Sequence, residues 1–85
     1  MLCIKENLTD QQVIISVEGK IDRDSLPTLK EVCSRHLESK KALAVVIQFH
    51  DMQGISIDAV KYLKHLKKKV SFLDLPDYLE MELFS

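Results

Sequence analysis

The chain has 85 residues, of which 46% are hydrophobic and 29% are charged, a composition typical of one small globular domain. Its 12 Lys and Arg side chains against 13 Asp and Glu give a formal net charge of -1. This balance gives no global reason to bind nucleic acid or an anionic membrane, so we expect neither partner. No apolar run is long enough to span a bilayer, and we expect no direct membrane insertion.

The N-terminal segment and the cysteines indicate the cellular compartment in which we expect the protein. Lys5, Glu6 and Asp10 interrupt any apolar core of a secretion signal. Cys3 and Cys33 are the only cysteines in the sequence, too few for a disulfide scaffold. We therefore expect a reduced, cytoplasmic protein in which both thiols are small buried groups.

A hairpin of two strands is expected at the N-terminus. Residues 1–6 alternate weakly between apolar and polar side chains, residues 7–11 are turn-like, and residues 12–18 are rich in β-branched side chains. Residues 19–24 then lead out of the second strand. These patterns predict an antiparallel pair at the start of the fold.

A helix is expected over residues 26–39, because Pro27 suits its first turn and either Asp24 or Ser25 can cap it. Its apolar stripe recurs at spacings of three and four and comprises Leu26, Leu29, Val32, Cys33, His36 and Leu37. The place of His36 on this stripe favours a histidine packed in the core or at its boundary over a metal ligand.

Residues 42–49 are almost continuously apolar, which predicts a central strand buried on both faces, followed by a loop that contains His50 and Asp51. A strand, a helix and a buried strand in succession predict a βαβ crossover. The expected fold is therefore α/β, with a mixed four-stranded sheet and two main helices on one face.

Two interpretations stay open for the last third of the chain. The apolar residues Ala59, Leu63, Leu66, Val70 and Leu73 recur at spacings of four and three, which predicts one helix over residues 57–74, stopped by Pro76. Alternation in residues 79–83 then predicts a final strand. The alternative is a strand over residues 70–75 and a last helix from Pro76. We favour the long helix because residues 67–69 contain no Gly or Asn on which to turn.

No constellation of residues typical of catalysis is present. His36, His50 and His65 lack metal-ligand spacing, and the isolated Gly19 and Gly54 form no phosphate-binding loop. Asp22 and Asp24 are close together in the sequence. Such a pair of carboxylates is more typical of helix capping than of acid–base catalysis. We expect no enzyme, no metal and no cofactor.

The junction between the buried strand and the next helix is the most informative site. Ser56 stands where an N-cap is expected, and Asp58 falls in the first turn, where the helix dipole favours a negative charge. The same helix carries a run of basic side chains that includes Lys61 and Lys64, typical of a solvated outer face or of a surface for an acidic partner.

At this point the chain resembles the STAS domain, the module named from sulphate transporters and anti-sigma factor antagonists. Residues 13–22 (VIISVEGKID) resemble the family's strand followed by Gly-x-Leu-Asp, and Asp22 matches its Asp. Residues 45–63 (VVIQFHDMQGISIDAVKYL) align without a gap to the family's apolar strand, loop, Asp-Ser-Ser-Gly-Leu and following helix. The resemblance covers the whole chain in outline, shortened at the C-terminus relative to the family.

The resemblance also shows departures. Where the family has Asp-Ser-Ser-Gly, this chain has Ser56, Ile57, Asp58 and Ala59 in order, and the family's strand-end Asp falls on Gln48. Ile57 takes the place of the phosphoacceptor serine and has no hydroxyl. Ser56, one residue earlier, is a weaker candidate because we expect it to be occupied as a cap. The charge of Asp58 opposes a neighbouring phosphate.

The resemblance implies a non-catalytic regulatory module that binds a protein partner, either a serine-kinase-type anti-sigma factor or the ATPase of an ABC lipid-transport system. The candidate partner-binding residues are Asp22, His50, Ser56, Ile57, Asp58, Lys61 and Lys64. Because a shortened fold leaves apolar surface and the edge at residues 78–84 open, we also expect a homodimer or other stable complex. A self-associating scaffold protein is the alternative function.

Overall fold

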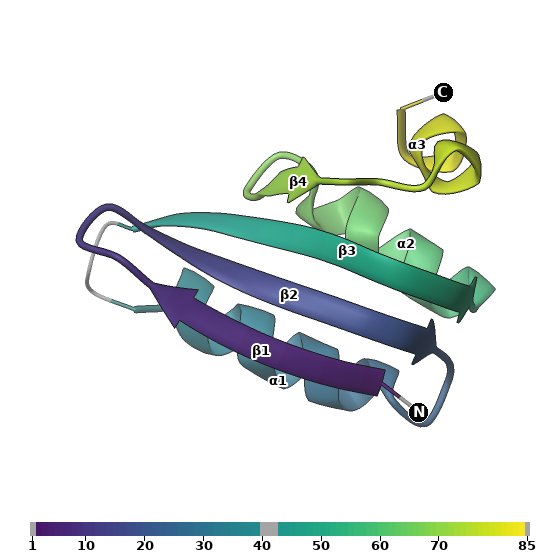
Figure 1. The fold of residues 1–85 in the computed structure, drawn as a ribbon, viewed down its shortest axis with the longest axis horizontal. Helices are drawn as coiled ribbons and strands as arrows, with labels where there is room; N and C mark the ends of the chain where they lie inside the picture. The colour runs from purple at the N-terminus through teal and green to yellow at the C-terminus, as the bar shows by residue number, and fades with distance from the viewer. Residues whose placement is uncertain (1, 40–42, 85) are drawn as a thin grey trace.

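The computed structural model describes residues 2–39 and 43–84, and these form seven elements in chain order (Figure 1). The strands are β1 (Leu2–Leu8), β2 (Gln12–Ile21), β3 (Ala44–Ile55) and β4 (Ser71–Leu73), and the helices are α1 (Leu26–Leu37), α2 (Ile57–Leu66) and α3 (Asp77–Phe84). Met1 and Ala42, at which we expected two strands to begin, lie outside the described residues.

The strands of the described chain form one open sheet in the order β1-β2-β3-β4. β1 pairs antiparallel with β2, whereas β2 with β3 and β3 with β4 pair in parallel. Both parallel crossovers step in the same direction along the sheet, and such connections are right-handed, so α1 and α2 lie on the same face. Figure 1 shows both helices behind the sheet. The expected α/β class and four-stranded mixed sheet are confirmed, with three helices where we expected two main ones.

The core lies between the sheet and its helices. Alternate side chains of β2 and β3 are buried on the helix-covered face, namely Val13, Ile15, Val17, Val45, Ile47 and Phe49. Burial of such apolar surface supplies most of the free energy that stabilises a small fold. On the other face of β3, Val46 is buried, but Ala44 is exposed and Gln48 is half-buried. The expected burial of β3 on both faces is therefore only partly correct.

β3 is longer than expected and includes His50 and the residues that follow it, which we had assigned to a loop. Its pairing with β2 shifts on either side of Gly19, because β3 contains the extra residues Asp51 and Gln53. Asp51 has φ 42° and Gly19 has φ 105°, both in the left-handed region. These irregularities let the strand continue through a sequence that lacks regular alternation.

The long helix expected over residues 57–74 is wrong. α2 ends at Leu66, whose carbonyl oxygen accepts hydrogen bonds from the backbone N–H groups of Lys69 at 2.7 Å and Val70 at 3.0 Å. The chain then pairs as β4 with β3. Leu73, which a continuous helical seam would bury, is exposed. The alternative interpretation, a strand followed by a last helix, describes this region correctly.

The final strand expected over residues 79–83 is also wrong, because this segment lies in α3. Leu79 and Leu83 are buried at a spacing of four, whereas Met81 between them is 73% exposed. A strand that buried Leu79 and Leu83 would have buried Met81 on the same face. The expected open edge at residues 78–84 is therefore wrong as well, and β1 and β4 form the two edges of the described sheet.

The apolar stripe of α1 is confirmed. Its first four members are buried, and His36 and Leu37 are half-buried. Cys33 is buried as expected, but the expectation for Cys3 is wrong, because this residue is exposed on β1. Cys3 pairs with Glu18 of β2, and its place in the strand alternation puts it on the face that α1 and α2 leave uncovered.

Candidate functional site

The first turn of α2 is fixed by Ser56, as the sequence predicts. Its hydroxyl oxygen accepts a hydrogen bond from the backbone N–H of Ala59 at 3.1 Å. Its own backbone N–H donates to the carbonyl oxygen of Ile21 at 2.8 Å, which ties the helix start to the end of β2. The Ser56 hydroxyl is thus occupied as a cap, and the first turn of α2 stands where β2 and β3 end.

The side chains that follow this cap are open to solvent. Ile57 is 76% exposed, and Asp58 is exposed beside it. The carboxylate of Asp58 lies in the first turn, where the helix dipole stabilises negative charge. Ile57 and Asp58 therefore present an apolar and an anionic group together at the end of the sheet.

A groove of about 680 Å³ lies on one side of this first turn, between α2 and α3. Its α2 wall is one helical stripe formed by Ile57, Val60, Lys61 and Lys64. The remaining lining residues come from the end of β3 and from α3, namely Met52, Gln53, Gly54, Ile55, Tyr78, Leu79 and Glu82. The groove thus combines an apolar floor with cations on the α2 side and a carboxylate on the α3 side.

A second hollow of about 470 Å³ lies on the other side of the first turn, between α2 and α1. Asp58 lines it, together with Lys61, Tyr62, His65, Arg23, Leu26, Pro27 and Lys30. The ammonium nitrogen of Lys30 lies 5.4 Å from the centre of the Tyr62 ring, within the range of a cation–π contact between the two helices. Ile57 and Asp58 consequently face different hollows, and Lys61 borders both.

His50 does not join this site. It lines a smaller polar hollow of about 280 Å³ with Cys3, Lys5, Ser16, Glu18 and Asp51. Cys3, Glu18 and His50 are direct register partners across β1, β2 and β3, so their side chains lie in one row on the uncovered face of the sheet. Within residues 2–39 and 43–84, no three His, Cys, Asp or Glu side chains are grouped so that they could hold a metal ion.

The side chain of Asp22 is hydrogen-bonded in the turn that leads into α1. Its Oδ1 accepts hydrogen bonds from the backbone N–H groups of Asp24 at 3.1 Å and Ser25 at 2.9 Å, while the Ser25 hydroxyl accepts from the Asp22 N–H at 2.9 Å. These bonds close the turn formed by residues 22–25, which leads into α1. These bonds from Ser25 hold the pKa of the Asp22 carboxyl below its ordinary value. Ser25 holds the N-cap position of α1 as the sequence predicts, but its side chain makes no cap hydrogen bond to the helix, so the expected side-chain cap by Asp24 or Ser25 is wrong.

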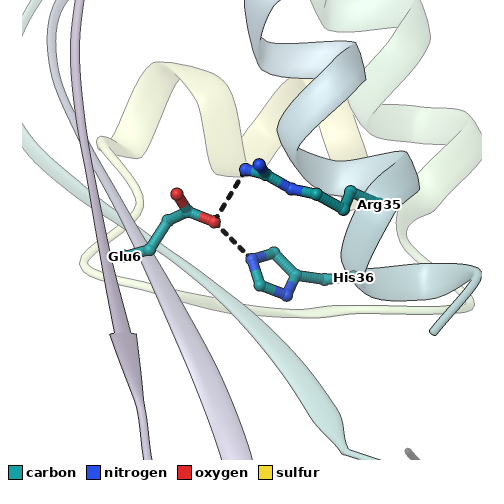
Figure 2. A network of polar contacts seen from close by, with 3 residues as sticks. All are labelled: Glu6, Arg35 and His36. Carbon is teal, nitrogen blue, oxygen red and sulfur yellow. Dashed lines mark hydrogen bonds and ion pairs between the residues drawn. The ribbon is translucent and has the colours of Figure 1, made fainter. Parts of the chain in front are cut away.

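An ionic cluster ties the edge strand β1 to the end of α1. Figure 2 shows the Glu6 carboxylate facing both Arg35 and His36. The Arg35 Nη2 lies 3.0 Å from Glu6 Oε1, and His36 Nε2 contacts the same oxygen. The hydrogen bond from His36, with the charges of both partners, lowers the pKa of Glu6. The boundary position expected for His36 is confirmed, and its partner is a carboxylate.

The buried Cys33 of α1 and the half-buried Tyr62 of α2 have raised pKa values. Burial raises the pKa of the Cys33 thiol to about 11 and that of the Tyr62 hydroxyl to about 12. Both groups are therefore neutral over the physiological range.

Comparison of the chain with protein-family models, with curated proteins and with solved structures finds no match. In the part of the chain that the structure describes, no helix is both long and apolar enough to cross a membrane.

The partner-binding residues predicted from the sequence do not all lie together in the structure. Ile57, Lys61 and Lys64 share the groove, whereas Asp58 lies on the α1 side of α2. Sequence analysis missed the wall of the groove that α3 forms, including Tyr78 and Glu82. The signal was present in the alternative interpretation, a last helix from Pro76, because residues four apart such as Tyr78 and Glu82 then share one side of that helix.

Proposed function

We propose that this chain is a non-catalytic, STAS-like interaction module that binds a protein partner through the first turn of α2. The observation that carries this proposal is the 76% exposure of Ile57 at the capped helix start. An apolar side chain in this place gains free energy when a partner covers it. Asp58 beside it gives the surface a negative charge without phosphorylation.

The occupied hydroxyl and carboxylate groups support a binding role over a chemical one. The Ser56 hydroxyl accepts from Ala59, and the Asp22 carboxylate accepts from Ser25 and Asp24. A nucleophile or a general base needs a group free to reach substrate, and these two are held in a helix cap and in the turn before α1. A contact surface needs only side chains in a fixed geometry.

The partner proposed is an ATPase of one of two kinds that the STAS resemblance implies, a serine-kinase-type anti-sigma factor or the ATPase of an ABC transporter. In a switchable STAS protein the charge at the helix start changes with phosphorylation. Here Asp58 would keep that charge constant, so binding would not respond to a kinase. At the rim of the hollow between α1 and α2, Asp58 would meet a basic side chain of the partner.

A photo-crosslinking amino acid at position 58 in living cells identifies the partner. The matched control places the same amino acid at Asp10, which is exposed in the turn between β1 and β2, at the opposite end of the sheet. We expect an adduct with an ATPase of one of the two kinds from position 58 and none from position 10. The absence of an ATPase adduct, or equal adducts from both positions, would refute the proposal.

Calorimetry with the identified ATPase then tests the charge. We expect Asp58→Asn to weaken binding about fivefold at low salt, because a charge at the rim of an interface contributes on the order of 1 kcal/mol. The effect should shrink as salt is added. Asp10→Asn is the control and should leave the affinity unchanged. An unchanged affinity for Asp58→Asn would show that the charge at the helix start plays no part.

A further inference from the structure

α3 carries large apolar side chains that the rest of the chain leaves uncovered. Leu79 and Leu83 attach one side of the helix to the core, and the opposite side exposes Met81, at 73%, with Tyr78 and Phe84 beside it. Tyr78 also lines the groove between α2 and α3, which continues to Ile57. Exposed apolar side chains that adjoin an apolar groove are typical of an interaction surface.

The charges around this surface are separated by sign. The α2 side of the groove carries Lys61 and Lys64, and in the described parts of the chain no ion pair joins either lysine to a carboxylate. The α3 side carries Asp77, which is one helical turn from Met81, and Glu82, which lines the groove. One surface thus holds an apolar, basic helix beside an apolar, acidic helix.

We propose that a second copy of this chain occupies the groove, so that two copies form a dimer through α2 and α3. In a dimer with two-fold symmetry the same patch meets itself, so the patch must contain both halves of its own complement. The surface formed by α2 and α3 contains both halves. In the dimer, Met81 and the carboxylates of α3 from one copy would contact Ile57 and the lysines of α2 from the other. Each copy would make the same contacts in return.

The dimensions of the two helices agree with this arrangement. The stripe from Ile57 to Lys64 is about 10 Å long and the eight residues of α3 are about 12 Å long, at the rise of an α-helix. The acidic helix that each copy offers is therefore matched in length to the basic stripe of the other. An unrelated acidic helix would also fit the groove, but the chain itself carries one at its rim.

The dimer and the proposed partner both use Ile57, because a second copy in the groove would cover the side chain that we propose the ATPase to contact. Asp58 lines the hollow on the α1 side of α2 and stays uncovered in such a dimer. Loss of the dimer and loss of the ATPase are nevertheless measured separately. The first is measured on the purified chain alone, and the second requires the ATPase.

Sedimentation of the purified 85-residue chain over a range of concentrations tests the proposal. We expect a reversible transition from the mass of one chain to the mass of two. Met81→Glu should weaken dimerisation about tenfold or more, the scale of a buried apolar contact at the centre of an interface. Because Met81 is exposed in the single chain, the variant should keep the far-UV circular dichroism of the parent. Leu8→Glu, at an exposed apolar residue of β1, is the matched control and should dimerise like the parent.

A charge exchange tests the pairing of α2 with α3. A chain with Lys61→Glu and Lys64→Glu, and a chain with Asp77→Lys and Glu82→Lys, should each fail to dimerise through repulsion of like charges. An equimolar mixture of the two should form a mixed dimer, because one chain then offers only acidic side chains and the other only basic ones. A single-chain mass for the parent up to millimolar concentration, a dimer unaffected by Met81→Glu, or a mixture that stays monomeric would overturn the proposal.

Discussion

The ammonium group of Lys67, at the end of α2, donates a hydrogen bond of 3.0 Å to the carbonyl oxygen of Leu83, near the end of α3. The same nitrogen lies 5.9 Å from the centre of the Phe84 ring. Carbonyl oxygens in the last turn of a helix lack partners within the helix, and a cation there also interacts favourably with the helix dipole. Lys67 therefore secures α3, the element that completes the groove.

Replacing Lys67 by Met keeps an aliphatic stem and removes the donor. We expect this substitution to lower the free energy of unfolding by about 1 kcal/mol, the net value of one such hydrogen bond. Urea denaturation measures the change. Lys68→Met removes the same charge from the next exposed position and should alter stability by less than about 0.5 kcal/mol. Equal effects of the two substitutions would mean that the contact with Leu83 contributes nothing.

The turn that leads into α1 gives a second prediction. Asp22→Ala removes the acceptor of two backbone N–H groups and should lower the stability of the chain. Asp22→Asn retains an acceptor oxygen and should cost less. Asp24→Ala is the control, because its side chain supplies no cap. Thermal unfolding that ranked Asp24→Ala as the most damaging of the three would contradict this assignment.

The contact of Glu6 with His36 and Arg35 predicts a dependence of stability on pH. The pKa of Glu6 is lower in the folded chain than its ordinary value of 4.5. A carboxyl group of this kind contributes stability above its unfolded pKa, and the contribution is lost as the pH falls through the folded value. Between neutral pH and pH values below 4.5, the parent should therefore lose more stability than Glu6→Gln does.

Denaturation of both chains at several acidic pH values measures this difference. Glu38→Gln, at an exposed position just after α1, serves as the control and should follow the parent. If Glu6→Gln lost stability as steeply as the parent below its ordinary pKa, the carboxylate would not be coupled to folding.

The two thiols should differ sharply in reactivity. Burial raises the pKa of Cys33 to about 11, and the thiolate is the reactive form, whereas Cys3 is exposed. In the native chain at pH 8, a thiol reagent should modify Cys3 within minutes and Cys33 only after denaturation. Cys3→Ser should abolish the fast reaction. A fast reaction that persisted in this variant would place Cys33 within reach of solvent.

The first two thirds of the fold could be predicted because local pattern and tertiary structure agree there. The β-branched run of β2, the apolar run of β3 and the stripe of α1 each match one kind of element. The prediction for the last third was wrong because four apolar residues recur there at the spacing of a helical seam, namely Leu63, Leu66, Val70 and Leu73. Pairing of β4 with β3 overrides that pattern, and Asp74 takes φ 56° at the end of β4 without the help of a glycine.

The candidate site could be predicted only in part for the same reason. The Ser56 cap depends on residues within one turn, and the sequence predicts it correctly. The groove depends on α3 returning to lie beside α2, a contact between segments far apart in the chain. Once the alternation of residues 79–83 is interpreted as a strand, Tyr78 and Glu82 are assigned to a sheet edge and the groove cannot be foreseen.

The brevity of β4 affects how the sheet meets other molecules. A foreign strand that added beside its three residues would gain only a short ladder of hydrogen bonds, whereas β1 at the far edge presents seven residues. Addition of a foreign strand is therefore favoured on β1 over β4. Lys5 is exposed on β1, and a charged side chain on an edge strand disfavours such pairing. Substitution of Lys5 by an apolar residue would remove this protection from the longer edge of the described sheet.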